Sequence, residues 1–253
     1  MQTAMNSIFP FWKRMIALLL SALLMMPVSA QSRSSKKQTK QSSSSPLTVL
    51  FIGDSITDGN RTRDNDWNHV MGHGYAQMLA ARLWFEQPGR FAMFYNRGIS
   101  GNTIADLAAR WQTDCIDLKP DVVSILVGIN DVHGIANGYL SQSIDEFEAT
   151  YRAVLDSTRA ALPQACIVMC EPFLLPGSRV DANPEVWQRE TKSRRMVVRA
   201  LANEYGAVFV PLQHPFDEAL KKAPVANWIW DGIHPMPAGH ELIAREWLKA
   251  MGW

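Results

Sequence analysis

One serine and one histidine in this sequence have the side chains and surroundings that acyl transfer requires. Ser55 lies in the glycine-rich run GDSITDG (53–59), and His234 lies near the C-terminus in the run DGIHP (231–235). A serine hydroxyl is a poor nucleophile unless a base removes its proton, and a neutral imidazole can accept that proton and return it to the leaving group. Ser55 is therefore a candidate nucleophile, and His234 is a candidate base for it.

Acyl transfer also needs hydrogen-bond donors for the oxyanion of the tetrahedral intermediate. The candidates are the backbone N–H groups of Ser55 and of a glycine, Gly98 or Gly101, and the side-chain amide of Asn130. Both glycines lie in the run NRGISGNT (96–103), and Asn130 lies in GIND (128–131). Each run also has a structural interpretation, because Gly, Asp and Ser form tight turns and Asn caps helices. The position of each run in the fold must distinguish a catalytic role from a structural one.

The elements that would position these residues follow a strand and helix alternation. Apolar runs predict strands at 48–52, 91–96, 122–128, 166–170 and 207–212. Amphipathic patterns predict helices at 75–85, 104–118, 144–162, 185–205 and 242–251. Continuous apolar runs are typical of strands buried on both faces, as in a parallel sheet covered by helices. We therefore predict an α/β fold, a three-layer α/β/α sandwich with a five-stranded parallel sheet.

The runs that carry chemistry fall at the ends of the predicted strands. Ser55, the run 96–103 and Asn130 follow the first, second and third strands, and the run 231–235 precedes the last helix. Ligands bind at the carboxyl ends of strands in such sheets. These four blocks, in this order, resemble the GDSL/SGNH hydrolase family over residues 47–253.

The resemblance implies a flavodoxin-like fold and the role of each residue. Asp231 would orient the His234 imidazole, and Gly101, rather than Gly98, would supply the oxyanion donor. The implied reaction is hydrolysis of a carboxylic ester through an acyl-Ser55 intermediate, with no cofactor and no metal. His69 and His73 have the spacing of zinc ligands on a helix, but neighbouring glycines argue against a helix there.

The acyl group and its acceptor are less constrained by the sequence. We expect a small-molecule or oligosaccharide ester, with a short acyl group such as acetyl on carbohydrate, because no extended apolar lid for a lipid tail is visible. Two alternatives stay open. The first is a lysophospholipase or thioesterase that acts on longer acyl chains, which the family includes. The second is a non-catalytic glycan-binding module, although no residue that the mechanism needs is missing.

Several side chains close to these runs are candidates for binding substrate. Asp54 precedes the nucleophile, Arg61 and Trp67 belong to the polar loop after it, and Trp228 and Trp230 precede the run 231–235. A tryptophan ring can form the wall of an acyl pocket or stack on a sugar. The alternatives are a solvated loop for Arg61 and Trp67 and core packing for Trp228 and Trp230.

The N-terminal segment and the charge predict where the protein works. Residues 1–30 combine two basic residues, an apolar stretch at 15–28 and small residues, which is typical of a cleavable signal peptide. The apolar stretch is shorter than the ~20 residues that span a bilayer, so we expect export to the periplasm or beyond the cell, without stable membrane insertion. Residues 31–46 predict a flexible linker ahead of the domain 47–253. A net charge of +1 argues against nucleic acid as a partner.

Overall fold

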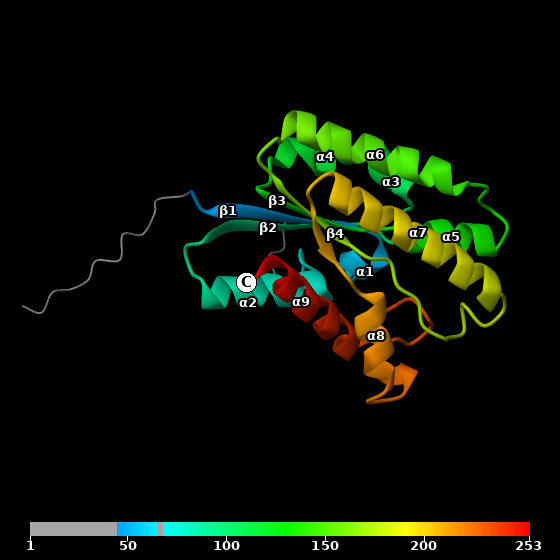
Figure 1. Ribbon diagram of the computed structural model, residues 1–253. Helices are drawn as coiled ribbons and strands as arrows, with labels where there is room; N and C mark the ends of the chain where they lie inside the picture. The colour runs from blue at the N-terminus through cyan, green and yellow to red at the C-terminus, as the bar shows by residue number, and fades with distance from the viewer. Residues whose placement is uncertain (1–44, 65–67) are drawn as a thin grey trace, which may run out of the picture. The chain divides into compact units, whose positions relative to one another are not determined.

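A parallel sheet forms the middle layer of the chain in this computed structural model, which describes residues 45–64 and 68–253 (Figure 1). Its strands are β1 (Leu47–Gly53), β2 (Phe91–Gly98), β3 (Val122–Leu126), β4 (Cys166–Cys170) and β5 (Val208–Val210). Their order is β2-β1-β3-β4-β5, and every pairing is parallel. The predicted five-stranded parallel sheet is confirmed. The predicted signal peptide, residues 31–44 of the predicted linker and Trp67 lie outside the described residues.

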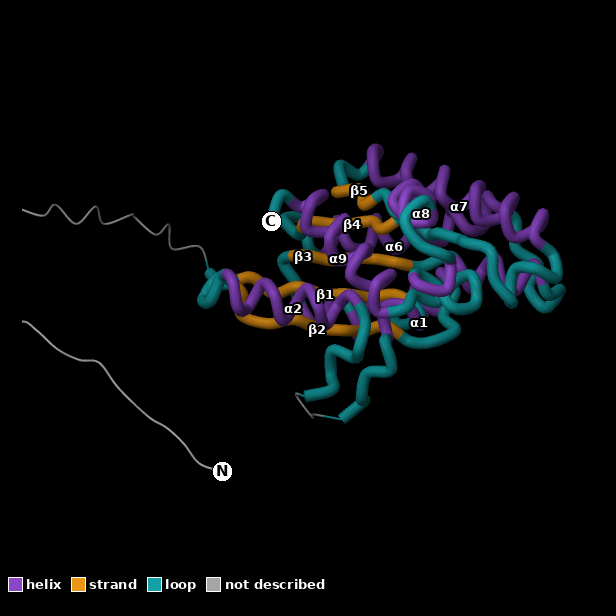
Figure 2. The backbone as a smooth tube through the Cα atoms, turned by 90° about the horizontal axis from the view of Figure 1, so that it is seen from below, coloured by secondary structure: helices purple, strands orange, loops and turns teal. Residues whose placement is uncertain are grey.

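Helices cover both faces of the sheet, which confirms the three-layer sandwich (Figures 1 and 2). One face carries α2 (Tyr75–Glu86), α8 (Gln213–Leu220) and α9 (Pro237–Met251). The other face carries α3 (Ile104–Ala109), α4 (Trp111–Asp114), α6 (Ile144–Ala161) and α7 (Pro184–Glu204). Two short helices, α1 (Ser55–Asp58) and α5 (Ile129–Ala136), begin where β1 and β3 end.

Burial on both faces explains why the strands have continuous apolar sequences. Phe51 of β1 packs between the helices of one face, with its ring centroid 5.8 Å from Tyr75 of α2 and 5.7 Å from Trp247 of α9. Leu50, the preceding residue, belongs to the core cluster on the opposite face. Successive side chains of a strand point to opposite faces, so both must be apolar here.

The predicted helix at 104–118 is wrong, because this segment forms α3, α4 and a 3₁₀ helix (Ile116–Leu118). The first break is at Arg110, whose backbone has φ −113° and ψ 10°. Its guanidinium donates hydrogen bonds to the carbonyl oxygens of Gly53 and Arg97 and to the side chain of Asn102. The backbone at Arg110 therefore departs from helical geometry, and its side chain contacts the strand ends instead.

The other helix predictions were close in position, with one boundary error. The helix predicted at 242–251 begins earlier, at Pro237, and this proline lies in its first turn. Proline is favoured there because its missing N–H would have no partner in the helix. The helices α1, α5 and α8 were not predicted, since stretches of four to eight residues show too little periodicity.

The ends of β1, β2 and β3 approach one another too closely for side chains at two positions. A Cβ atom on Gly53 would lie 2.1 Å from the carbonyl oxygen of Leu126, and one on Gly98 would lie 2.2 Å from the backbone nitrogen of Asp58. The side-chain amide of Asn96 binds the same region, since its Nδ2 donates to the carbonyl oxygens of Thr57 and Met71. The end of β2 is thus packed against α1.

Candidate active site

Ser55, His234 and Asp231 form a continuous chain of hydrogen bonds at the carboxyl edge of the sheet. The Oγ of Ser55, the first residue of α1, lies 2.9 Å from Nε2 of His234. Nδ1 of His234 lies 2.7 Å from Oδ2 of Asp231. The other carboxylate oxygen, Oδ1, accepts the backbone N–H groups of Ile233 and His234 at 3.1 and 2.9 Å. The local turn from Asp231 to His234 therefore has the carboxylate facing the imidazole.

Asp231 is a buried carboxylate that is fully hydrogen-bonded, and only 1% of it is exposed. Burial alone would raise its pKa, but hydrogen bonds from His234, from Arg179 and from backbone N–H groups outweigh burial and hold the pKa below its usual range. Asp231 is therefore ionised at neutral pH, and an anionic acceptor favours a proton on the Nδ1 atom of His234.

Arg179 is a site residue that the sequence did not indicate. It lies in the loop between β4 and α7, where its Nε donates to Oδ2 of Asp231 and its backbone N–H donates to the carbonyl oxygen of Asp231. The loop can approach this closely because of Gly177, on which a Cβ atom would lie 2.3 Å from the carbonyl carbon of Asp231. No motif marks such a loop, so only the folded chain reveals the contact.

The predicted oxyanion donors lie at the same cavity as Ser55. Gly101 and Asn130 both line it, and Nδ2 of Asn130 donates to the carbonyl oxygen of Asn102 at 3.1 Å. Gly101 has φ +87°, a conformation that L-residues with a Cβ rarely adopt. Gly98, by contrast, is packed beneath α1. The structure thus gives the two glycines different tasks, close packing for Gly98 and a turn at the cavity for Gly101.

The cavity has a volume of about 790 Å³, and its walls combine polar side chains with apolar surface. Besides Ser55 they include His133, Tyr139, Leu140 and Arg179. The hydroxyl of Tyr139 and Nδ1 of His133 lie 2.5 Å apart, and 66% of Tyr139 is exposed. These walls present donors and acceptors suited to a hydroxyl-rich ligand.

The residues predicted to bind substrate have different surroundings. Asp54 is buried and caps α1 by accepting the N–H of Ile56, and Nε of Arg61 donates to the carbonyl oxygen of Gly98, so both hold the backbone in place. Trp228 lines a separate cavity beside α8 and α9. Trp230 is 61% exposed, and its ring stacks on His234 at a centroid distance of 5.8 Å.

Neither a metal-binding cluster nor a membrane-spanning helix is found in the part of the chain that the structure describes. Within 45–64 and 68–253, no group of three or more His, Cys, Asp or Glu residues is arranged to hold a metal ion. The rings of His69 and His73 lie 6.2 Å apart. No helix in the same part of the chain is long and apolar enough to cross a membrane.

The chain belongs to the GDSL-like lipase/acylhydrolase family, whose family model matches residues 51–242. It is 36% identical over 211 residues to an acetylxylan esterase from Geobacillus stearothermophilus, which covers 81% of this chain and 94% of the relative. YqeF, an uncharacterised lipoprotein of Bacillus subtilis, is 27% identical over 126 residues, which are 50% of this chain and 49% of the relative. Together the family and the esterase define a carboxylic ester hydrolase.

Solved structures show the same relationship. A protein described as a GDSL-like lipase from Parabacteroides merdae superposes with a TM-score of 0.77 at 38% identity, covering 81% of this chain and 95% of that one. Axe2, an acetylxylan esterase from Geobacillus stearothermophilus, has a TM-score of 0.73 at 36% identity, covering 83% and 95%. Two catalytic mutants of Axe2, with a serine or an aspartate replaced by alanine, are similar as well.

The burial of Asp54 predicts a specific dependence of stability on pH. Loss of solvation on burial, aided by the charge of Asp131, raises the pKa of Asp54 to about 7. Because the pKa of Asp54 is higher in the folded than in the unfolded chain, where it is near 4, its contribution to the free energy of unfolding is complete below about pH 4. That contribution is lost as the pH rises to about 7. The side chain of Asp54→Asn stays neutral at every pH. We therefore expect the free energy of unfolding of this variant, relative to that of the wild type, to be roughly 2 to 3 kcal/mol higher at pH 8 than at pH 5.

Urea denaturation at the two pH values measures this gain. The amide oxygen of the variant can still accept the N–H of Ile56, so the helix cap is retained. A difference in the free energy of unfolding between variant and wild type that is the same at pH 5 and pH 8 would contradict the burial argument.

Proposed function

We propose that this protein removes short acyl groups, acetyl above all, from carbohydrate through an acyl-Ser55 intermediate. The observation that carries the proposal is the chain of hydrogen bonds from Ser55 through His234 to Asp231, at a cavity that Ser55 and His234 both line. The similarity to an acetylxylan esterase over most of both chains supports the choice of substrate.

The geometry supports a two-step reaction. As Oγ of Ser55 attacks the acyl carbon, Nε2 of His234 takes its proton, and Asp231 stabilises the imidazolium that forms. The N–H groups of Ser55 and Gly101 and the amide of Asn130 stabilise the oxyanion. His234 then donates the proton to the departing sugar oxygen. In the second step His234 takes a proton from water as the water oxygen attacks the acyl carbon, and it returns this proton to Oγ of Ser55 as the bond to the acyl group breaks and the acid leaves.

The walls of the cavity favour a sugar as the alcohol part of the ester. Trp230 presents an exposed ring beside His234, where a sugar ring can stack on it. Tyr139 and Arg179 offer hydrogen-bond donors to hydroxyl groups. We further propose that the N-terminal segment exports the enzyme, which brings it to polysaccharides outside the cytoplasm.

Single substitutions test the nucleophile and its partners. We expect Ser55→Ala and His234→Ala to lower kcat on a short-chain aryl ester by at least about 10⁴-fold, because each removes an essential part of the reaction. Asn130→Ala should lower kcat by about 10²- to 10³-fold, as for a single oxyanion donor. The matched controls are Ser157→Ala and His214→Ala, which alter exposed residues on α6 and α8. Full activity in Ser55→Ala would rule out the proposed nucleophile.

The length of the acyl group separates the main proposal from the lysophospholipase or thioesterase alternative. We expect kcat/KM on nitrophenyl esters to be highest for acetyl and to fall as the chain lengthens, and we expect acetylated xylo-oligosaccharides to release acetate. A maximum at long chains would favour the alternative. Binding of oligosaccharide without any ester hydrolysis would favour a glycan-binding module.

Arg179 predicts a loss of activity when its guanidinium is removed. Its Nε donates to Oδ2 of Asp231, the same oxygen that faces Nδ1 of His234. Without that bond the carboxylate is held less firmly, so it orients the imidazole less well. We expect Arg179→Met to lower kcat on an aryl acetate by about 3- to 10-fold. Arg179→Lys, which keeps a cationic donor, should lower kcat less, and wild-type kcat in Arg179→Met would contradict this role.

A further inference from the structure

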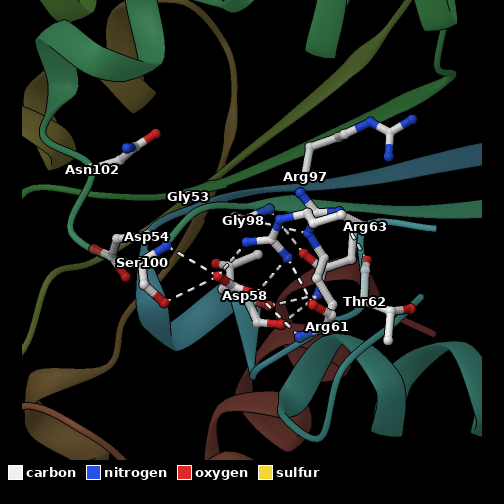
Figure 3. Close-up of polar contacts among 12 residues, drawn as sticks. Gly53, Asp54, Asp58, Arg61, Thr62, Arg63, Arg97, Gly98, Ser100 and Asn102 are labelled. Carbon is white, nitrogen blue, oxygen red and sulfur yellow. Dashed lines mark hydrogen bonds and ion pairs between the residues drawn. The ribbon is translucent and has the colours of Figure 1, made fainter. Parts of the chain in front are cut away.

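Asp58, the last residue of α1, is a buried carboxylate whose two oxygens are both engaged (Figure 3). It is 3% exposed. Oδ2 accepts hydrogen bonds from the backbone N–H and the hydroxyl of Ser100, both at 3.0 Å, and from Nη2 of Arg63 at 2.8 Å. Oδ1 accepts from Nη1 of Arg63 and from the backbone N–H of Arg61, both at 3.1 Å. The mechanism described above uses none of these contacts directly.

The charge of Asp58 is retained at neutral pH. Burial would raise its pKa, but the hydrogen bonds from Arg63 and Ser100 outweigh burial and hold the pKa below its usual range. Hydrogen bonds to an ionised acceptor are about twice as strong as bonds between neutral groups. Asp58 therefore holds Ser100 firmly, with the bidentate Arg63 as its counter-ion.

Ser100 is the residue before Gly101, the predicted oxyanion donor. The N–H of Asn102 donates to the carbonyl oxygen of Ile99 at 3.2 Å, so Ser100 and Gly101 are the two central residues of a turn. The positive φ of Gly101, +87°, is typical of the second central residue of a type II turn. Types I and II differ by a flip of the peptide between the central residues, and that peptide carries the Gly101 N–H.

Packing gives this turn little support at its tip. The space where a Cβ of Gly101 would lie has no atom within 4 Å. The polar anchors on either side therefore fix the peptide: Asp58 holds Ser100, and Asn130 donates to the carbonyl oxygen of Asn102. The first of these anchors comes from the same short helix that begins with Ser55.

We propose that Asp58 is a positioning residue of the oxyanion hole: by binding the N–H and hydroxyl of Ser100, it fixes the Ser100–Gly101 peptide so that the Gly101 N–H faces the oxyanion. This inference rests on the proposed function, since it assigns a task at the same site. Asp58 itself does not touch the substrate. One short helix thus sets both the nucleophile and one of its oxyanion donors.

The test replaces Asp58 with asparagine, which keeps the shape of the side chain. An amide has one acceptor oxygen and two N–H donors, so it cannot accept the bonds of Ser100, Arg61 and Arg63 together. We expect kcat on an aryl acetate to fall by about 10- to 100-fold with KM within about twofold, because a displaced donor weakens binding of the transition state rather than of the substrate.

Inhibitor binding distinguishes this role from a general loss of structure. We expect the inhibition constant of a boronic acid, which forms a tetrahedral adduct with a serine, to rise by about the same factor as kcat falls. The inhibition constant of acetate should stay within about twofold. Titration with an organophosphate that labels the nucleophile gives the fraction of the enzyme that is folded and active. Each kcat is calculated from the concentration of that fraction.

Three further variants serve as comparisons. Ser100→Ala removes only the hydroxyl bond to Asp58 and should lower kcat by about 3- to 10-fold. Arg63→Ala leaves the bonds between Asp58 and Ser100 in place and should lower kcat less than Asp58→Asn does. Asp121→Asn is the matched control, because Oδ2 of Asp121 accepts the backbone N–H of Thr48 at the opposite end of β1, and its kcat should equal that of the wild type.

The outcomes are separable from those for the proposed function. The positioning role would be overturned by a wild-type kcat in Asp58→Asn, or by a fall in kcat with unchanged affinity for the boronic acid. In either case an inactive Ser55→Ala would still support Ser55 as the nucleophile. An active Ser55→Ala would instead overturn the proposed function. If Asp58→Asn does not fold, kcat and boronic acid affinity in Ser100→Ala decide the question by the same criteria.

Discussion

The close approach of three parallel strand ends around α1 is the constraint on which the site depends. Gly53 and Gly98 leave no room for a Cβ atom, so the ends of β1 and β2 lie directly against β3 and α1. Asn96 binds backbone carbonyl oxygens in the same region. Because the strands are parallel, the segments after them meet at one edge, and the order of strands reverses between β1 and β3. Ser55, Gly101 and Asn130 come together for that reason.

Two buried carboxylates organise opposite sides of this edge, and each is paired with an arginine. Asp231, with Arg179, faces the imidazole that would act as base. Asp58, with Arg63, faces the turn that carries the Gly101 N–H. Removing either arginine would leave a buried carboxylate with an unbalanced charge, which is costly in free energy. The same pairs that stabilise the fold therefore also fix the geometry of the site.

The sequence predicted the layers of the fold because burial on both sides leaves a strong signal in the strands. It failed where tertiary contacts override local preference. Arg110 breaks the helix predicted at 104–118, since its guanidinium binds strand-end carbonyl oxygens that are remote in sequence. The hydrophobic periodicity of the sequence did not indicate α1 and α5, because these helices are too short to show a clear period.

The site was predictable to the extent that its residues lie next to strand ends. Arg179 was missed because its contact with Asp231 depends on how a loop packs, and no pattern in that loop reveals it. Trp228 and Trp230 are two residues apart, yet one lines a separate cavity and the other stacks on His234. Trp228 ends a 3₁₀ helix and Trp230 follows an isolated bridge, a local geometry that spacing alone does not encode.

The central claim is that an acyl group is carried transiently on Ser55. The most direct test is mass spectrometry of the enzyme quenched in acid during turnover of nitrophenyl acetate, followed by peptide mapping. The account predicts one acetyl group, on Ser55, which is absent from Ser55→Ala treated in the same way. Rapid hydrolysis with no acetyl group on the protein, or with the group on another residue, would contradict it.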